Sequence, residues 1–205
     1  MDSNLPSPQI SSLRDITLTE IQQHFSSKTL TSTQLVQTYL ARIAEVDHEF
    51  HSVIETNPDA LAIAAARDAE LALGRRRSIL HGVPILLKDN LPTLDATETT
   101  CGSFALLGAK PAKEAEVVTA LRNAGAVILG KANMAEWAGF RSTSGCSGWS
   151  ARGGQTTGPF VKGSKASGSS GGGAVATALG LCFAAIGTEV CRASCGCGRE
   201  RQLTN

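Results

Sequence analysis

The spacing of apolar and polar residues predicts two helices within the first fifty positions. Residues 17–20 (TLTE) have the form of a capping box and predict a helix that runs through about Phe25. Residues 31–34 (TSTQ) repeat this form at the start of a longer helix. Apolar residues recur along that helix at the spacing of one core-facing side, namely Leu35, Val36, Tyr39, Leu40 and Ile43.

A third helix and a buried strand are predicted next. Asn57 and Pro58 are the residue types of a helix N-cap and first helical position, and Gly74 is suited to end the helix. Residues 82–89 (GVPILLKD) then form a short apolar run that ends in charged residues. Such a run is typical of a strand buried on both faces.

The helix-then-strand pattern continues after residue 110. Residues 114–123 predict a helix with Val117, Val118 and Leu121 facing inward, and Gly125 should stop it. Residues 126–130 (AVILG) are a second apolar run and predict another buried strand. Helices that alternate with buried strands predict an α/β fold, with a central sheet covered by helices on both faces.

A segment rich in glycine and serine, residues 142–173, follows and could be a flexible linker by composition alone. It leads, however, into a predicted helix at residues 174–179 and a predicted strand at 182–187. A glycine-rich loop that opens onto a helix is typical of a binding site, because backbone N–H groups at a helix start are unpaired. A phosphate loop is the weaker alternative, since no Gly-Lys-Ser/Thr ending follows.

Composition narrows the classes of partner. The formal net charge is +1 and aromatic residues make up 4% of the chain, so neither direct nucleic-acid binding nor an anionic membrane surface is favoured. The first residues have no signal-peptide pattern, and the longest apolar stretch, residues 174–186, is too short to span a membrane. We therefore expect a cytoplasmic location. The six cysteines are expected to be free thiols.

Lys88 is the first candidate for chemistry. It ends an apolar strand, where burial would lower its pKa from the ordinary value of about 10.4 and make the amine usable as a general base. The alternative is a strand-end lysine whose ammonium group extends to water. The second candidate is the loop at residues 167–173 (SGSSGGG), where a hydroxyl could relay a proton and N–H groups could hold an oxyanion.

Together these segments resemble the amidase-signature family, over residues from about Leu13 to Glu189. The resemblance rests on ordered blocks at family-like spacing, which are residues 80–90, 124–134, 148–156, 168–172 and 186–189. It implies a mixed central sheet flanked by helices, of which this chain holds the N-terminal portion. It also implies hydrolysis of a carboxylic amide of a small molecule, with no metal or organic cofactor.

The resemblance further implies a Ser–cis-Ser–Lys catalytic triad. Lys88 corresponds to the base, and Ser169 to the serine that the family holds on a cis peptide bond after a glycine, here Gly168. Neutral lysine would take a proton from Ser169, which would take one from the nucleophilic serine, and an acyl-enzyme would form and be hydrolysed. The supporting loop comprises Gly168, Ser170, Gly171 and Gly172, expected to orient this relay.

The sequence departs from the family after Glu189. The nucleophile's position falls on Ala193, and Ser194 lies one residue too late to replace it. We therefore expect residues 1–189 to be the N-terminal part of the amidase-signature domain, truncated before the nucleophile, and residues 190–205 to be an aberrant, disordered tail. The late cysteines lack the spacing of a zinc site. Our hypothesis is that residues from Val190 are translated intron or out-of-frame sequence, because Val-Cys can be encoded by a splice-donor sequence.

Two alternatives to a simple amidase stay open. The glutamine-hydrolysing component of a tRNA-dependent amidotransferase is expected to share this site but to act in a complex. A non-catalytic fragment or pseudo-enzyme would keep the fold without the activity. Two smaller departures, Lys165-Ala166 before the loop and Gly173 within it, leave Lys88 and Ser169 in place.

Overall fold

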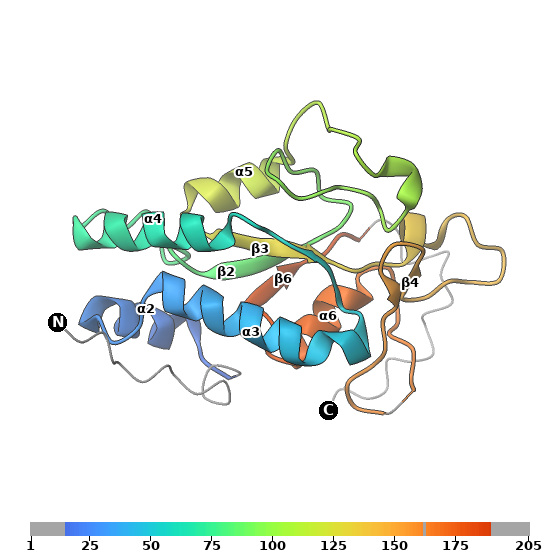
Figure 1. The fold of residues 1–205 in the computed structure, drawn as a ribbon, viewed down its shortest axis with the longest axis horizontal. Coiled ribbons are helices and arrows are strands. Elements are labelled where there is room, and N and C mark those ends of the chain that lie inside the picture. The colour runs from blue at the N-terminus through green and yellow to red at the C-terminus, as the bar shows by residue number, and fades with distance from the viewer. Residues whose placement is uncertain (1–14, 162, 190–205) are drawn as a thin grey trace.

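A four-stranded mixed sheet forms the centre of the molecule (Figure 1). The computed structural model describes residues 15–161 and 163–189. The strand order is β1-β3-β2-β6, in which β2 pairs in parallel with β3 and β6, and β1 pairs antiparallel with β3. The strands are β1 (Val53–Thr56), β2 (Pro84–Lys88), β3 (Val127–Ala132) and β6 (Ala184–Ile186). The predicted α/β fold with a mixed central sheet is thus confirmed.

The two central strands are buried along their whole length, which explains their continuous apolar sequences. Successive side chains point to opposite faces of a sheet. Accordingly Leu86 and Leu129 lie in one core cluster, whereas Leu87 and Ile128 lie in the other. The sheet therefore separates two apolar cores, and both need helices to cover them.

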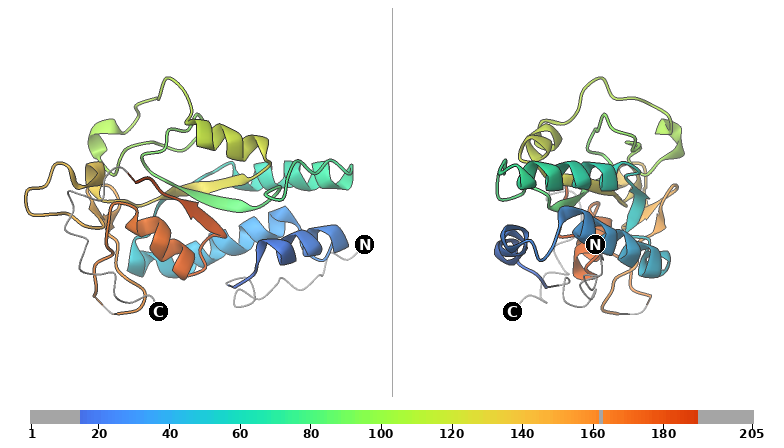
Figure 2. Two further views of the ribbon diagram at one scale, coloured as in Figure 1. Left: turned by 180° about the vertical axis from the view of Figure 1, so that it is seen from behind. Right: turned by 60° about the vertical axis from the view of Figure 1, so that its left-hand side comes forward.

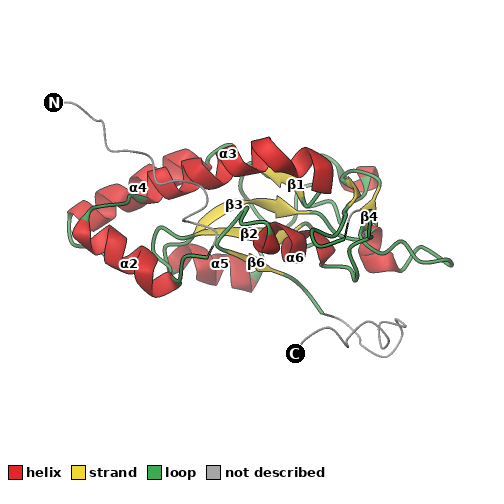
Figure 3. Ribbon diagram, turned by 90° about the horizontal axis from the view of Figure 1, so that it is seen from below, coloured by secondary structure: helices red, strands yellow, loops and turns green. Residues whose placement is uncertain are grey.

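Helices cover the two faces unequally. The larger core takes residues from α2 (Leu18–Ser27), α3 (Ser32–Phe50), α4 (Ala60–Ala72) and α6 (Gly171–Ala178), and the smaller core takes residues from α5 (Glu116–Asn123). Figure 1 shows α5 on one side of the sheet and α3 and α6 on the other, and Figure 2 shows the same arrangement from behind. Figure 3, from below, shows α3 and α6 in front of the strands.

Both predicted capping boxes are present. The Thr17 side chain accepts from the Glu20 N–H, and the Glu20 carboxylate accepts from the Thr17 N–H. Thr31 and Gln34 make the same reciprocal pair at the start of α3. The predicted apolar stripe of α3 is buried except for Leu40, which is partly exposed.

The predicted N-cap at Asn57 was wrong, because α4 begins at Ala60 and its N-cap is Asp59. The Asn57 side chain is buried and makes a tertiary contact instead. Its Nδ2 donates to the carbonyl oxygen of Ile128 at 2.9 Å, and its Oδ1 accepts from the Asp59 N–H at 3.0 Å. This link to β3 holds the turn before the helix, so the contact between elements outweighed the local capping preference.

Val117 was also predicted wrongly as an inward-facing residue. Its side chain is 40% exposed, whereas Val118 and Leu121 are buried. Adjacent residues on a helix point about 100° apart, so this short helix buries only the narrow stripe that faces the smaller core.

The glycine- and serine-rich segment is ordered around one buried side chain, that of Asn133. The Asn133 Nδ2 donates to the carbonyl oxygen of His51 and to Thr156 Oγ1, and its Oδ1 accepts from Ser150 Oγ at 2.7 Å. A two-stranded sheet, β4 (Trp149–Ser150) and β5 (Gly154–Gln155), lies within this segment. Over the described residues, the flexible-linker alternative is therefore wrong. The short helices η1 (Phe104–Leu106) and η2 (Glu136–Gly139) were not predicted.

Candidate active site

The candidate residues meet where the parallel strands end. Lys88 is the last residue of β2, and Thr188 lies two residues beyond the neighbouring parallel strand β6. Ser169 and Ser170 directly precede α6, which begins at Gly171. Carboxyl ends of parallel strands lie at one edge of a sheet, which is where open α/β sheets place their binding sites. The topology therefore brings together residues that are up to a hundred positions apart.

Lys88 is almost completely buried, with 2% of its surface exposed. Its Nζ donates to Ser169 Oγ at 2.7 Å, to Thr188 Oγ1 at 2.9 Å and to the Thr188 carbonyl oxygen at 3.3 Å. These contacts match the three N–H donors of an ammonium group. The alternative of a lysine that extends to water is therefore wrong.

Burial lowers the pKa of Lys88 from 10.5 to about 8, because the charged form loses its hydration. The negative charge of Glu189 acts in the opposite direction. With such a pKa, on the order of a tenth of the side chains are neutral at pH 7. The Lys88 amine can then accept a proton along its 2.7 Å contact with Ser169 Oγ.

Thr188 is a site residue to which the sequence assigned no role, although it lies within a family-like block. Its Oγ1 accepts from Lys88 Nζ and also from Asn90 Nδ2, at 3.0 Å. Its carbonyl oxygen accepts from Ser170 Oγ at 3.2 Å. The Asn90 Oδ1 is buried and accepts no hydrogen bond from a described residue. A hydroxyl placed just beyond a strand that pairs with the lysine's strand is the signal that could have identified Thr188.

The peptide bond before Ser169 is trans, so the predicted cis bond was wrong: no cis peptide bond occurs in residues 15–161 and 163–189. Gly168 has a φ of +76°, a left-handed conformation that glycine adopts without steric cost. This turn brings Ser169 Oγ to Lys88 without a cis bond. The Ser169 carbonyl oxygen also accepts from the Ala135 N–H at 3.1 Å, which ties the loop to the segment after β3.

Gly171 and Gly172 allow α6 to pack closely. A Cβ at Gly172 would lie 2.2 Å from the Asn133 carbonyl oxygen and 2.6 Å from that of Ser52, and a Cβ at Gly171 would lie 3.0 Å from the Ala166 Cβ. These glycines therefore let the start of α6 lie directly against the backbone of other segments.

A cavity of about 250 Å³ adjoins the Lys88 side chain. Its lining residues come from β2, α6 and the end of β6; they are Lys88, Ser170, Gly173, Ala174, Thr177, Ala185, Ile186 and Gly187. A larger hollow of about 710 Å³ lies between α2 and the chain after α4, at the opposite end of the molecule, and holds none of the predicted site residues. We place the candidate site at the smaller cavity, because the buried lysine and the serine hydroxyls meet there.

Ala193, Ser194 and the tail at residues 190–205 lie outside the described residues, as do Cys191, Cys195 and Cys197. Cys101, Cys146 and Cys182 are free thiols, as predicted. Within the described part of the chain, no three His, Cys, Asp or Glu side chains gather as a metal site, and no helix is long and apolar enough to cross a membrane.

Comparison with known proteins assigns the family. The family model named Amidase matches residues 34–191. A protein of Arabidopsis thaliana named as a probable amidase is 49% identical over 180 residues, which are 87% of this chain and 35% of that protein. A glutamyl-tRNA(Gln) amidotransferase component from Solidesulfovibrio magneticus is 38% identical over 88% of this chain and 36% of its own length.

Solved structures agree. The peptide amidase of Stenotrophomonas maltophilia superimposes with a TM-score of 0.83 and 48% identity, covering 85% of this chain and 36% of that one. The chain therefore belongs to the amidase family, as the resemblance predicted. It spans about a third of the length of the relatives it matches.

Proposed function

We propose that this chain supplies the base and the relay serine of an amide-hydrolysing site. The contact of 2.7 Å between Lys88 Nζ and Ser169 Oγ carries the proposal. Neutral Lys88 would accept the Ser169 proton while Ser169 accepts the proton of a nucleophilic serine, which attacks the amide carbonyl. The amine leaves with a proton, an acyl-enzyme remains, and water hydrolyses it by the reverse relay. Ser170 and Asn90 would orient the relay through Thr188.

The nucleophile is the part of this mechanism that the sequence does not supply at the family position, which holds Ala193. We propose that residues 1–189 belong to the amidase-signature domain and that residues 190–205 are not part of it. On this proposal the 205-residue chain does not turn over amides, and its lineage function is hydrolysis of a small-molecule carboxylic amide without a cofactor.

A second candidate function is glutamine hydrolysis within a tRNA-dependent amidotransferase. The 38% identity to a glutamyl-tRNA(Gln) amidotransferase component supports it. The higher identity to a peptide amidase, 48%, favours a stand-alone amidase. Co-purification with partner proteins and activity that depends on tRNA would favour the amidotransferase, and turnover of simple amides by the isolated protein would favour the amidase.

The deciding experiment compares two proteins on simple amides, with ammonia release as the readout. One is the 205-residue chain, and the other is the product of the sequenced, spliced transcript. We expect turnover only by the second, and loss of at least about a hundredfold in kcat/KM on Lys88→Met or Ser169→Ala. Lys165→Met, which removes an exposed lysine near the loop, is the matched control.

Two results would contradict the proposal. Turnover by the 205-residue chain that disappears on Ser169→Ala would refute its inactivity. A mature transcript that reads through the Val190 codon to a stop after Asn205 would refute the intron hypothesis and favour a non-catalytic family member.

A further inference from the structure

Lys131 is a completely buried lysine that the proposed mechanism does not use. It lies on the central strand β3, and its Nζ donates to the Leu91 carbonyl oxygen at 2.8 Å and to Thr99 Oγ1 at 3.0 Å. Removing an ammonium group from water is unfavourable, and apolar residues of similar volume often replace such a charge without loss of stability. A role in holding the sheet together therefore does not account for a lysine here.

Both acceptors of Lys131 lie in one loop, residues 89–102, which we call the β2 loop. A second buried charge, that of Asp89 at the start of this loop, binds the other end of the loop. The Asp89 carboxylate accepts from the Thr100 N–H, the Thr100 hydroxyl and the Gly102 N–H. Two buried charges of opposite sign, one on β3 and one directly after β2, thus hold the beginning of this loop against its end.

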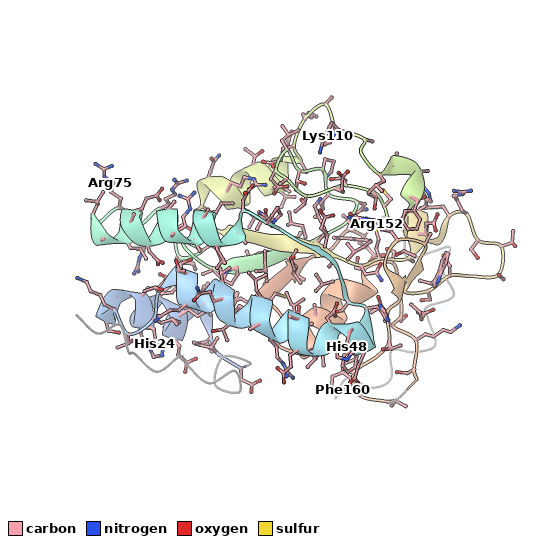
Figure 4. All side chains as sticks on the ribbon, in the orientation of Figure 1. His24, His48, Arg75, Lys110, Arg152 and Phe160 are labelled. Carbon is pink, nitrogen blue, oxygen red and sulfur yellow. The ribbon has the colours of Figure 1, made fainter. Side chains whose placement is uncertain are left out.

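Charged groups from several elements surround Lys131. Asp89, Asp95 and Glu55 favour its charged form, Arg152 disfavours it, and burial lowers the pKa of Lys131 to about 8. Arg152, labelled in Figure 4, pairs with Glu55 and lies 3.8 Å from Asp89. The lysine is therefore one member of a buried network of opposite charges that joins β1, β3, the β2 loop and the turn between β4 and β5.

The β2 loop is connected to the candidate base. Asn90 lies between Lys88 at the strand end and Leu91, whose carbonyl oxygen Lys131 holds. The Asn90 Nδ2 donates to Thr188 Oγ1, and the same hydroxyl accepts from Lys88 Nζ. The far end of the loop also lies beside the end of β2, because the Cys101 N–H donates to the carbonyl oxygen of Asp89, the residue after Lys88, at 3.2 Å. Movement of this loop would therefore expose Lys88 and remove a contact that orients it.

We propose that Lys131 is a positioning residue that holds the β2 loop closed. Asn90 then keeps its hydrogen bond to Thr188, Thr188 keeps its contact with Lys88, and water stays off the Lys88 amine. The value of this arrangement for amide hydrolysis rests on the proposed function. The arrangement itself can be tested without any activity measurement.

The test is Lys131→Met in the full chain, because methionine fills similar space without the ammonium group. Trace acetylation with acetic anhydride at several pH values, quantified by mass spectrometry on the peptide that carries Lys88, measures the pKa of Lys88. We expect this pKa to rise from about 8 toward 10.5, because water reaches the amine once the loop opens. Alkylation of Cys101 by iodoacetamide should become at least about fivefold faster, while buried Cys182 stays unreactive.

Two further variants complete the test. Lys110→Met removes an exposed lysine whose Nζ lies 3.8 Å from Glu98 of the same loop (Figure 4), and it should change neither readout. Thr99→Val removes one of the two Lys131 acceptors and should shift both readouts in the same direction but less. Thr99→Val also decides the matter if Lys131→Met does not fold.

An unchanged Lys88 pKa and Cys101 rate in folded Lys131→Met would overturn the proposal, as would unchanged values in Thr99→Val. Lower stability without a change in the Lys88 pKa would indicate a purely structural lysine and would also overturn it. If the product of the spliced transcript turned over no amide, the proposed function would fail, whereas the expected shifts in the 205-residue chain would still support the positioning role, so the two failures are distinguishable.

Discussion

Burial of Lys88 is energetically unfavourable, because a side chain that can be charged is enclosed at the end of β2. For a lysine whose pKa falls on folding, the folded state disfavours the proton. The resulting destabilisation is complete below about pH 8 and is lost as the pH rises toward 10.5, where the unfolded chain also releases the proton.

We predict that Lys88→Met removes this pH dependence. The stability of the parent chain relative to the variant should rise by about 2 kcal/mol between about pH 7.5 and pH 9.5. Urea unfolding of both proteins at the two pH values measures the difference. Cys182 has a raised pKa, about 12, which acts in the opposite direction, but it is present in both proteins and cancels. A constant difference across this range would show that Lys88 is not protonated with a lowered pKa in the folded chain.

At the scale of single elements, helix α6 positions Ser169 and Ser170, which directly precede it. The helix can do so because its first three residues are glycines without side chains. Gly172 lies against the backbone of Asn133 and Ser52, which connects the helix start to the segments that follow β3 and precede β1. The position of Ser169 therefore depends on how closely α6 approaches the sheet.

We predict that Gly172→Ala lowers the free energy of unfolding by at least about 2 kcal/mol, since rigid backbone atoms cannot make room for the new methyl group. Gly173→Ala is the matched change one residue on. Its Cβ would lie 3.1 Å from the Ala185 Cβ, a contact that a small shift relieves. Alanine is more favourable than glycine in a helix by about 1 kcal/mol, so the net effect of Gly173→Ala on the free energy of unfolding should be small. Equal losses in urea unfolding would contradict this account of Gly172.

At the scale of the whole molecule, the sheet is the most protected part, since β2 and β3 are paired on both sides and buried on both faces. The edge strands β1 and β6 each pair with one neighbour. Local opening requires less free energy where fewer buried contacts are broken.

We predict that amide hydrogens of Leu87 and Leu129 exchange more slowly than those of the edge strands, by at least about tenfold. Amides of the β4–β5 sheet should exchange faster again, because this sheet contains only two short strands. Hydrogen exchange followed by mass spectrometry of short peptides measures the order. Fastest exchange in the β2 or β3 peptides would mean that the sheet is not the stable centre of this chain.

The amino-acid sequence by itself determined the local signals: two capping boxes, the stripe of α3, two buried strands and the family-like blocks that include Lys88 and Ser169. These follow from short-range hydrogen bonding and from side-chain periodicity, both of which act within a few residues. Tertiary structure decided what depends on distant partners. Asn57 became a contact to β3, the bond before Ser169 is trans, and Thr188 and Lys131 acquired their contacts. Strand order and loop closure set these pairs, and no local pattern encodes which strands become neighbours.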